Sequence, residues 1–172
     1  YATSIMRELA ETSWQANQLV VFDRGNAVVI AQQEAPHYWG ISIRVGSNIS
    51  LFDTGSGHVL LAFRSPEERA MMIAEHLRSN EEMKQAPDFF ARLDQVRQRG
   101  YEMMASLQTA GVYNLSAPVL GSDGRGIAAL TIPYITLVNA PAAPDITKTI
   151  ALLQEATARL SKLAGSDVGT TA

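Results

Sequence analysis

Apolar and polar positions form their clearest pattern over residues 100–133, where they predict a short strand, a loop and then two longer strands. Asp123-Gly124 marks the turn between the long strands, because this dipeptide favours the two positive φ angles of a type I′ turn. Pairing outward from that turn fixes which residues face each other across the hairpin. The predicted pairs are Ser122 with Arg125, Ser116 with Thr131, and Asn114 with Pro133.

Because side chains alternate across a strand, this hairpin has two different faces. One face is entirely apolar and is suited to a core; it carries Leu115, Ala117, Val119, Ala128, Leu130 and Ile132. The other face mixes neutral polar and apolar side chains; it carries Asn114, Ser116, Thr131, Pro133, Val112 and Ile127. A mixed face of this kind suits a small-molecule pocket, but it also suits contact with solvent, and the pattern leaves both interpretations open.

Helical spacing of apolar residues recurs along the rest of the chain. The helix that begins after Ser65 has the strongest start signal, with a serine cap, Pro66 at the first helical position and Glu68 three residues after the cap. A glycine signal ends another helix at Gly100. Further helices are predicted over residues 2–12, 58–63 and 145–163, and the Ser65 helix is predicted to run to about Ser79.

Strand patterns lie on both sides of these helices. Residues 19–22 and 27–31 predict a second hairpin, and the alternation of Trp39, Ile41, Ile43 and Val45 predicts one half-buried strand. Strands that adjoin through hairpins give a mainly antiparallel sheet. The sequence therefore predicts an α+β domain with helices packed on the sheet.

Composition sets the broad class of protein. The 172 residues are expected to form a single domain, with residues 164–172 as a flexible tail, and the chain begins inside a helical pattern as a piece of a longer protein would. Its net charge is −3 without a basic run, so by itself it is poorly suited to bind nucleic acid. It has no cysteine and no apolar run of membrane-spanning length, and a cytoplasmic location is expected.

Candidate chemistry is sparse. The three histidines show no metal-binding spacing, so no metal and no cofactor are predicted. Residues 54–58, Thr-Gly-Ser-Gly-His, precede a short helix and could present backbone N–H groups to an anion, or could simply allow close packing. The segment lacks the features of a P-loop, a dinucleotide fingerprint and a nucleophile elbow. No catalytic set is found, and the chain is predicted not to be an enzyme.

Several segments, in order and over nearly the whole chain, resemble the C-terminal effector-binding domain of the IclR family of bacterial transcription regulators. They are Arg44-Val45-Gly46, Gly57, Leu60-Leu61-Ala62, Pro66-Glu67-Glu68, Arg99-Gly100-Tyr101, Gly111-Val112, Ala117-Pro118-Val119, Asp123-Gly124 and Ala128-Ala129-Leu130, together with the hairpin from Leu19 to Glu34.

The resemblance implies a GAF-like (profilin-like) fold, with a curved sheet, helices against one side and a ligand cavity at the other. It implies a homodimer or homotetramer that senses a small-molecule effector. DNA binding would belong to a winged helix-turn-helix domain before Tyr1. A ligand would then shift the oligomer between two arrangements, with the first helix as the transmitter.

Carried over residue by residue, the family's pocket falls on ten positions of this chain: Tyr38, Ile41, Ser42, Gly55, Ser56, Met104, Val112, Asn114, Thr131 and Pro133. The chain departs from the family pattern at four places: Met104 replaces a common acidic residue, Asn114 a cysteine, Pro133 a serine and His58 a lysine. Met104 and Pro133 make the predicted cavity more apolar. We therefore expect a ligand with an aromatic or otherwise apolar body and at most one anionic or carbonyl end, near Ser56.

Two other functions remain open at this point. A dimerisation module without a ligand would have its cavity filled by its own side chains. A small GAF-like enzyme would need a titratable side chain inside the cavity, and Met104 and Pro133 argue against one.

Overall fold

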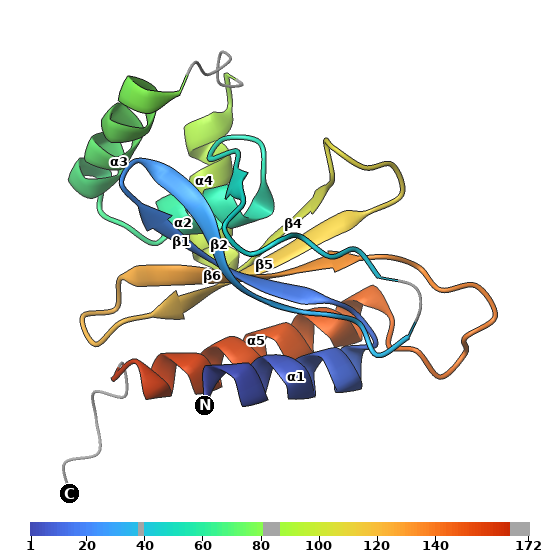
Figure 1. Cartoon of the computed structure of the whole chain (residues 1–172). Coiled ribbons are helices and arrows are strands. Elements are labelled where there is room, and N and C mark those ends of the chain that lie inside the picture. The colour runs from blue at the N-terminus through green and yellow to red at the C-terminus, as the bar shows by residue number, and fades with distance from the viewer. Residues whose placement is uncertain (38–39, 81–86, 166–172) are drawn as a thin grey trace, which may run out of the picture.

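A six-stranded antiparallel sheet forms the centre of the protein, with helices on both of its faces (Figure 1). The computed structural model describes residues 1–37, 40–80 and 87–165. The strands are β1 (Asn17–Asp23), β2 (Asn26–Gln33), β3 (Asn48–Ile49), β4 (Glu102–Ala105), β5 (Tyr113–Leu120) and β6 (Gly126–Tyr134), in the spatial order β3-β2-β1-β6-β5-β4. The helices are α1 (Ala2–Ser13), α2 (Gly55–Ala62), α3 (Pro66–Ser79), α4 (Phe89–Arg99) and α5 (Ile146–Leu163). The predicted α+β class is confirmed.

The β5–β6 hairpin has the predicted register but not the predicted turn. Ser116 pairs with Thr131, as expected. At the turn only Gly124 has positive φ, at 78°, so the connection is not type I′. The Gly124 N–H instead donates to the Gly121 carbonyl at 3.0 Å, and an irregularity between Val119 and Leu120 shifts the ladder by one residue. That shift compensates for the longer turn, which is why the inner pairs are unchanged.

The β1–β2 hairpin, by contrast, has the two-residue turn with positive φ at both central positions. Arg24 and Gly25 have φ of 49° and 83°, and Asp23 pairs with Asn26 across them. The second predicted hairpin is therefore confirmed, and its strands extend beyond the apolar runs that predicted them.

The predicted strand over Trp39–Val45 is wrong for the part that the structure describes, because residues 40–45 form no strand. The edge of β2 pairs with the short strand Asn48–Ile49, which follows a bend at Gly46, whose φ is 89°. Val29 of β2 also exchanges backbone hydrogen bonds with this bend, accepting from the Gly46 N–H and donating to the Ser47 carbonyl. Ile41 and Ile43 alternate with polar residues because both face inward from a loop: Ile41 lines a cavity and Ile43 packs against a core cluster. Trp39 lies outside the described residues.

The predicted helices are all present, and their ends follow local capping rules. Ser65 Oγ accepts the Glu68 N–H at 3.2 Å at the start of α3, and Thr54 Oγ1 accepts the Gly57 N–H at 3.1 Å at the start of α2. Gly100 ends α4 with φ of 91°. None of the helices among the described residues is both long enough and apolar enough to cross a bilayer.

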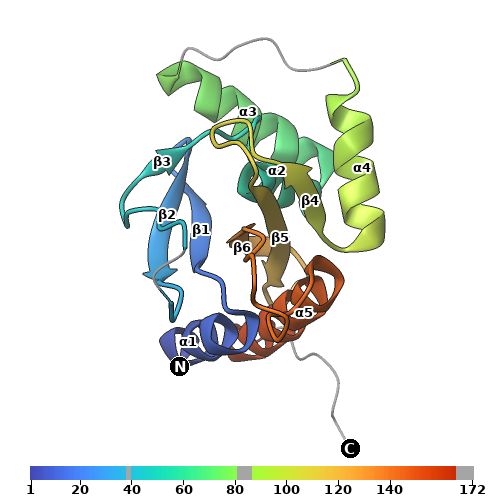
Figure 2. The ribbon, with the colours of Figure 1, turned by 90° about the vertical axis from the view of Figure 1, so that its right-hand side faces the viewer.

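The two faces of the sheet bury different clusters. α1 and α5 lie side by side on one face, and α2, α3 and α4 gather beyond the other (Figures 1 and 2). The predicted apolar face of the β5–β6 hairpin is buried against α1 and α5; its members are Leu115, Ala117, Val119, Ala128, Leu130 and Ile132. The mixed face therefore points to the side of α2, which is where a cavity lies. Helices cover part of this side too, so they are not confined to one face.

Candidate ligand-binding site

A cavity of about 370 Å³ lies between the mixed face of the sheet and the start of α2. Three parts of the chain form its wall: the sheet, the segment from residue 41 to α2, and the loop between β4 and β5. The lining residues are Gln18, Ile41, Ile43, Asn48, Ile49, Ser50, Thr54, Gly55, Ser56, Ser106, Gln108, Thr109, Val112, Asn114, Thr131 and Pro133. The volume is within the range of small-molecule sites.

Most of the residues predicted for the pocket come together here. The wall contains Ile41, Gly55, Ser56, Val112, Asn114, Thr131 and Pro133. Ser42 is exposed on the loop beside Ile41 and is not part of the wall. Met104 pairs with Asn114 across β4–β5, so it shares the same face of the sheet, but it is not in contact with the cavity either. Tyr38 lies outside the described residues.

The predicted pocket did not include the other lining residues: Gln18, Ile43, Asn48, Ile49, Ser50, Thr54, Ser106, Gln108 and Thr109. Of these, Thr54 was noted only as the first residue of the possible anion-binding segment 54–58. Most of them lie in loops, where no periodic pattern marks an inward side chain. Gln18 is different, because it belongs to β1 and points to the same face as Val20 two residues later. A polar residue in phase with a buried apolar one was the signal that could have identified it.

The start of α2 comes unusually close to the sheet. A Cβ atom on Gly55 would lie 2.8 Å from Ser116 Oγ, so only glycine fits there without displacing a neighbour. Thr54 caps the third N–H of the helix, while the N–H groups of Gly55 and Ser56 are in the first turn, where no helical carbonyl can accept them. These two donors at the positive end of the helix are suited to an anionic or carbonyl oxygen.

Three hydroxyl groups tie α2 to the floor of the cavity. Thr131 Oγ1 lies 2.6 Å from Ser56 Oγ and 2.6 Å from Ser116 Oγ, and each of the three residues is at most 2% exposed. The chain of hydroxyls is neutral and largely self-satisfied. It positions the helix start without introducing a charge.

The wall of the cavity carries no charge among the residues that the structure describes. Its polar groups are hydroxyls, carboxamides and backbone amides, and none of its side chains is ionisable. The described residues also contain no cluster of three or more potential metal ligands. A fully charged, hydrophilic ligand would lose its hydration here without gaining a counter-ion.

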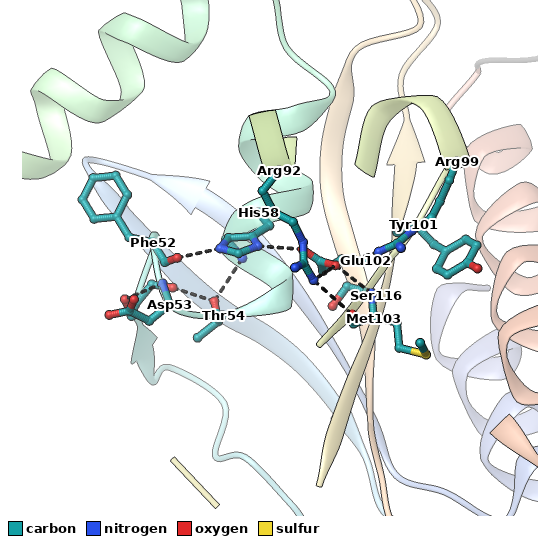
Figure 3. Close-up of polar contacts among 12 residues, drawn as sticks. Phe52, Asp53, Thr54, His58, Arg92, Arg99, Tyr101, Glu102, Met103 and Ser116 are labelled. Carbon is teal, nitrogen blue, oxygen red and sulfur yellow. Dashed lines mark hydrogen bonds and ion pairs between the residues drawn. The ribbon is translucent and has the colours of Figure 1, made fainter. Parts of the chain in front are cut away.

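Next to the cavity, on the same face of the sheet, lies a buried charged network centred on Glu102 (Figure 3). Glu102 is fully buried, and its carboxylate accepts hydrogen bonds from His58 Nδ1 at 2.7 Å, from Arg92 Nη2 at 2.8 Å and from Arg99 Nη2 at 2.8 Å. Burial by itself raises the pKa of Glu102, but the hydrogen bonds and positive charges of His58 and Arg92 outweigh it, so the pKa lies below its ordinary value. The network joins α2, α4 and β4.

A glutamate beside a histidine is a common acid–base pair, but here both ring nitrogens of His58 are hydrogen-bonded within the protein. His58 Nε2 lies 2.6 Å from the Phe52 carbonyl oxygen, so both ring nitrogens face acceptors. Neither His58 nor Glu102 lines the cavity. The pair is therefore structural: it fixes the short helix whose first turn borders the cavity.

Fold and site together define a class: an α+β domain with a cavity of small-molecule size whose described lining is uncharged. The chain belongs to the family described as the C-terminal domain of the bacterial transcriptional regulator IclR, which matches residues 1–162. The family that the sequence pointed to is thus confirmed.

Individual relatives agree with this assignment. The HTH-type transcriptional regulator KdgR of Escherichia coli (strain K12) is 30% identical over 135 residues, which cover 77% of this chain and 51% of that protein. The crystal structure of the C-terminal domain of E. coli KdgR has a TM-score of 0.75 at 28% identity, over 95% of this chain and 96% of that one. The crystal structure of Pseudomonas aeruginosa HmgR has a TM-score of 0.76 at 26% identity, over 98% of this chain and 67% of that one. The chain thus spans about half the length of E. coli KdgR, and the KdgR relatives are named as transcription regulators, not enzymes.

Proposed function

We propose that this domain senses a small organic acid with an aromatic or otherwise apolar body. The observation that carries the proposal is the cavity itself, open, of about 370 Å³, and lined by uncharged side chains. Ile41, Val112 and Pro133 supply apolar surface for the body of the ligand. Tyr38, Ser42 and Met104 stay predictions as ligand contacts.

The anionic end of the ligand lies at the start of α2. Gly55 and Ser56 offer backbone donors at the positive end of the helix. Asn114 lies beside this helix start, since its Cβ is 3.4 Å from where a Cβ on Gly55 would be. One helix start compensates one negative charge in part, and the described wall has no cation for a second. A monocarboxylate is therefore favoured over a dicarboxylate.

The signal passes through the sheet to the oligomer. Thr131 on β6 faces the cavity, while its neighbours Leu130 and Ile132 are buried under α1 and α5 on the opposite face. A ligand that favours one position of β6 would thereby bias how α1 sits in a homodimer or homotetramer, and with it a DNA-binding domain joined to α1 that binds the operator. The size of the shift is limited by the difference in ligand affinity between the two arrangements. Identical scattering profiles of the full-length regulator with and without ligand would contradict this mechanism.

The two rival functions fit the site less well. An enzyme needs a titratable group at its substrate, and the described lining of the cavity has none. A dimerisation module needs no open cavity. Native mass spectrometry that found neither a retained nor an added ligand would favour the dimerisation module.

Calorimetry on the chain tests the ligand class. Benzoate and phenylacetate are expected to bind at least about 10-fold more tightly than glyoxylate or pyruvate, because each buried methylene-sized unit contributes about 0.8 kcal/mol. Ile41→Trp, which fills the cavity from a loop, should abolish binding. Arg44→Trp places the same side chain on an exposed residue of the same loop that is not part of the cavity wall, and should leave binding intact. Tighter binding of the small polar acids would refute the proposed class.

A further inference from the structure

Two buried glutamines, Gln15 and Gln18, differ in whether their carboxamide groups have hydrogen-bond partners in the protein. Gln15 is 2% exposed, and its carboxamide is satisfied twice by the backbone of Ile135: Nε2 donates to the carbonyl at 2.9 Å and Oε1 accepts the N–H at 3.1 Å. Gln18 is 3% exposed and lines the cavity, yet none of the hydrogen bonds among the described residues involves its carboxamide. Gln18 is thus a buried amide with unused donors and an unused acceptor.

The groups around Gln18 do not supply a partner. Thr131 lies opposite Gln18 on β6, but its hydroxyl is already hydrogen-bonded to the hydroxyls of Ser56 and Ser116. Gln32, opposite Gln18 on β2, has a buried Nε2 that is itself without a hydrogen-bond partner. The carboxamide of Gln18 is not among the fully buried atoms without a partner, so it is open to the cavity, where water or a ligand can complete its hydrogen bonds.

We propose that Gln18 is a specificity-determining residue that reads a neutral hydrogen-bonding substituent, a hydroxyl or a keto oxygen, on the ligand. The inference rests on the proposed function and adds a second polar contact to it, distinct from the anionic end at α2. A carboxamide both donates and accepts, which matches a hydroxyl group. The substituent is neutral because the described wall offers no counter-ion.

The first test needs no ligand. Gln18→Leu is compared with Gln15→Leu by thermal unfolding of the ligand-free chain. Gln15→Leu removes two hydrogen bonds and should lower the midpoint by roughly 4 °C or more. Gln18→Leu should leave the midpoint unchanged or raise it, since it removes no hydrogen bond within the protein and adds apolar surface to the wall. An equal fall in both variants would show that Gln18 is bonded within the protein, to Gln32 for example, and would overturn the proposal.

The second test uses benzoate, 3-hydroxybenzoate and 4-hydroxybenzoate as probes in calorimetry. At least one hydroxybenzoate should bind the wild-type chain roughly 10-fold more tightly than benzoate. In Gln18→Leu that advantage should vanish, while the affinity for benzoate stays within about 2-fold.

The two proposals fail separately. Binding of all three probes with no advantage for a hydroxyl, or an advantage that survives Gln18→Leu, overturns the role of Gln18 and leaves the proposed ligand class intact. If none of the probes binds the wild-type chain, the aromatic class is refuted, and the comparison with Gln15→Leu decides whether Gln18 has an unmet hydrogen bond.

Discussion

Replacing Glu102 by glutamine should destabilise the protein far more than replacing a carboxylate on the surface. Glu102 has no surface exposed to water. Its carboxylate accepts hydrogen bonds from the side chains of His58, Arg92 and Arg99 and from the N–H of Met103. Glu102→Gln keeps the shape of the side chain and one acceptor oxygen but removes the negative charge. The positively charged partners then lose their counter-ion inside the protein.

The size of the effect depends on how well each partner can reach water. The side chains of Arg92 and Arg99 are 38% and 37% exposed, so both can be rehydrated, and their share of the loss is discounted. The side chain of His58 is 8% exposed and stays in place. A charge-assisted hydrogen bond contributes about 1.5–3 kcal/mol, so a loss of about 2–3 kcal/mol is expected. The loss stays at this level because the glutamine keeps one acceptor oxygen for these donors and the two arginines can turn to water.

Urea unfolding followed by circular dichroism measures this loss, and the chain provides a matched control. Glu8 pairs with Arg159 at 2.6 Å between α1 and α5, with side chains 56% and 46% exposed. Glu8→Gln also removes one carboxylate from an ion pair with arginine, but exposed pairs contribute about 1 kcal/mol or less. Only the Glu102 variant should show a large fall in the urea midpoint at an unchanged slope.

A Glu102→Gln variant as stable as wild type would refute this reasoning. It would mean that the free-energy cost of desolvating the carboxylate equals the stabilisation from its hydrogen bonds, as happens in some buried ion pairs. Equal losses in the Glu8 and Glu102 variants would likewise show that burial adds nothing to the pair.

Three further outcomes are expected. Gly57→Ala would place its Cβ against the Leu51 carbonyl oxygen, and should cost about 3 kcal/mol by overpacking; Gly111→Ala, where no atom lies within 4 Å but φ is 77°, should cost only about 1–2 kcal/mol in the same urea titration. Thr131→Val removes the central hydroxyl of the buried chain and should cost about 1–3 kcal/mol by leaving two hydroxyls unpaired, measured against wild type. Because the folded pKa of Glu102 lies below its ordinary value, the contribution of Glu102 to the stability of the wild-type protein should be fully present above about pH 4.5 and be lost as the pH drops through the folded pKa. Glu102→Gln should therefore lose less stability in acid than wild type, and an unchanged acid profile would contradict the assignment.

Local patterns in the sequence were sufficient for the scaffold. Helix ends follow from Ser65 and Gly100, whose effects act within one turn of the chain. The two faces of the β5–β6 hairpin follow from alternation, so Asn114 and Thr131 could be assigned to one side of the sheet before any fold was known. The turn at Gly124 shows how far this extends: its type was predicted wrongly, yet the register held because a bulge compensated.

Long-range packing determined the rest, because it brings together residues whose sequence neighbourhoods carry no mark of the contact. Glu102 meets His58 across 44 positions, which turns a carboxylate with no visible role into the anchor of α2. The alternation at Ile41 and Ile43 came from facing a cavity and a core, not from strand pairing. Gln18 likewise acquires its meaning only in three dimensions: a glutamine is unremarkable in a sequence, and whether its amide finds a partner depends on what the other strands place around it.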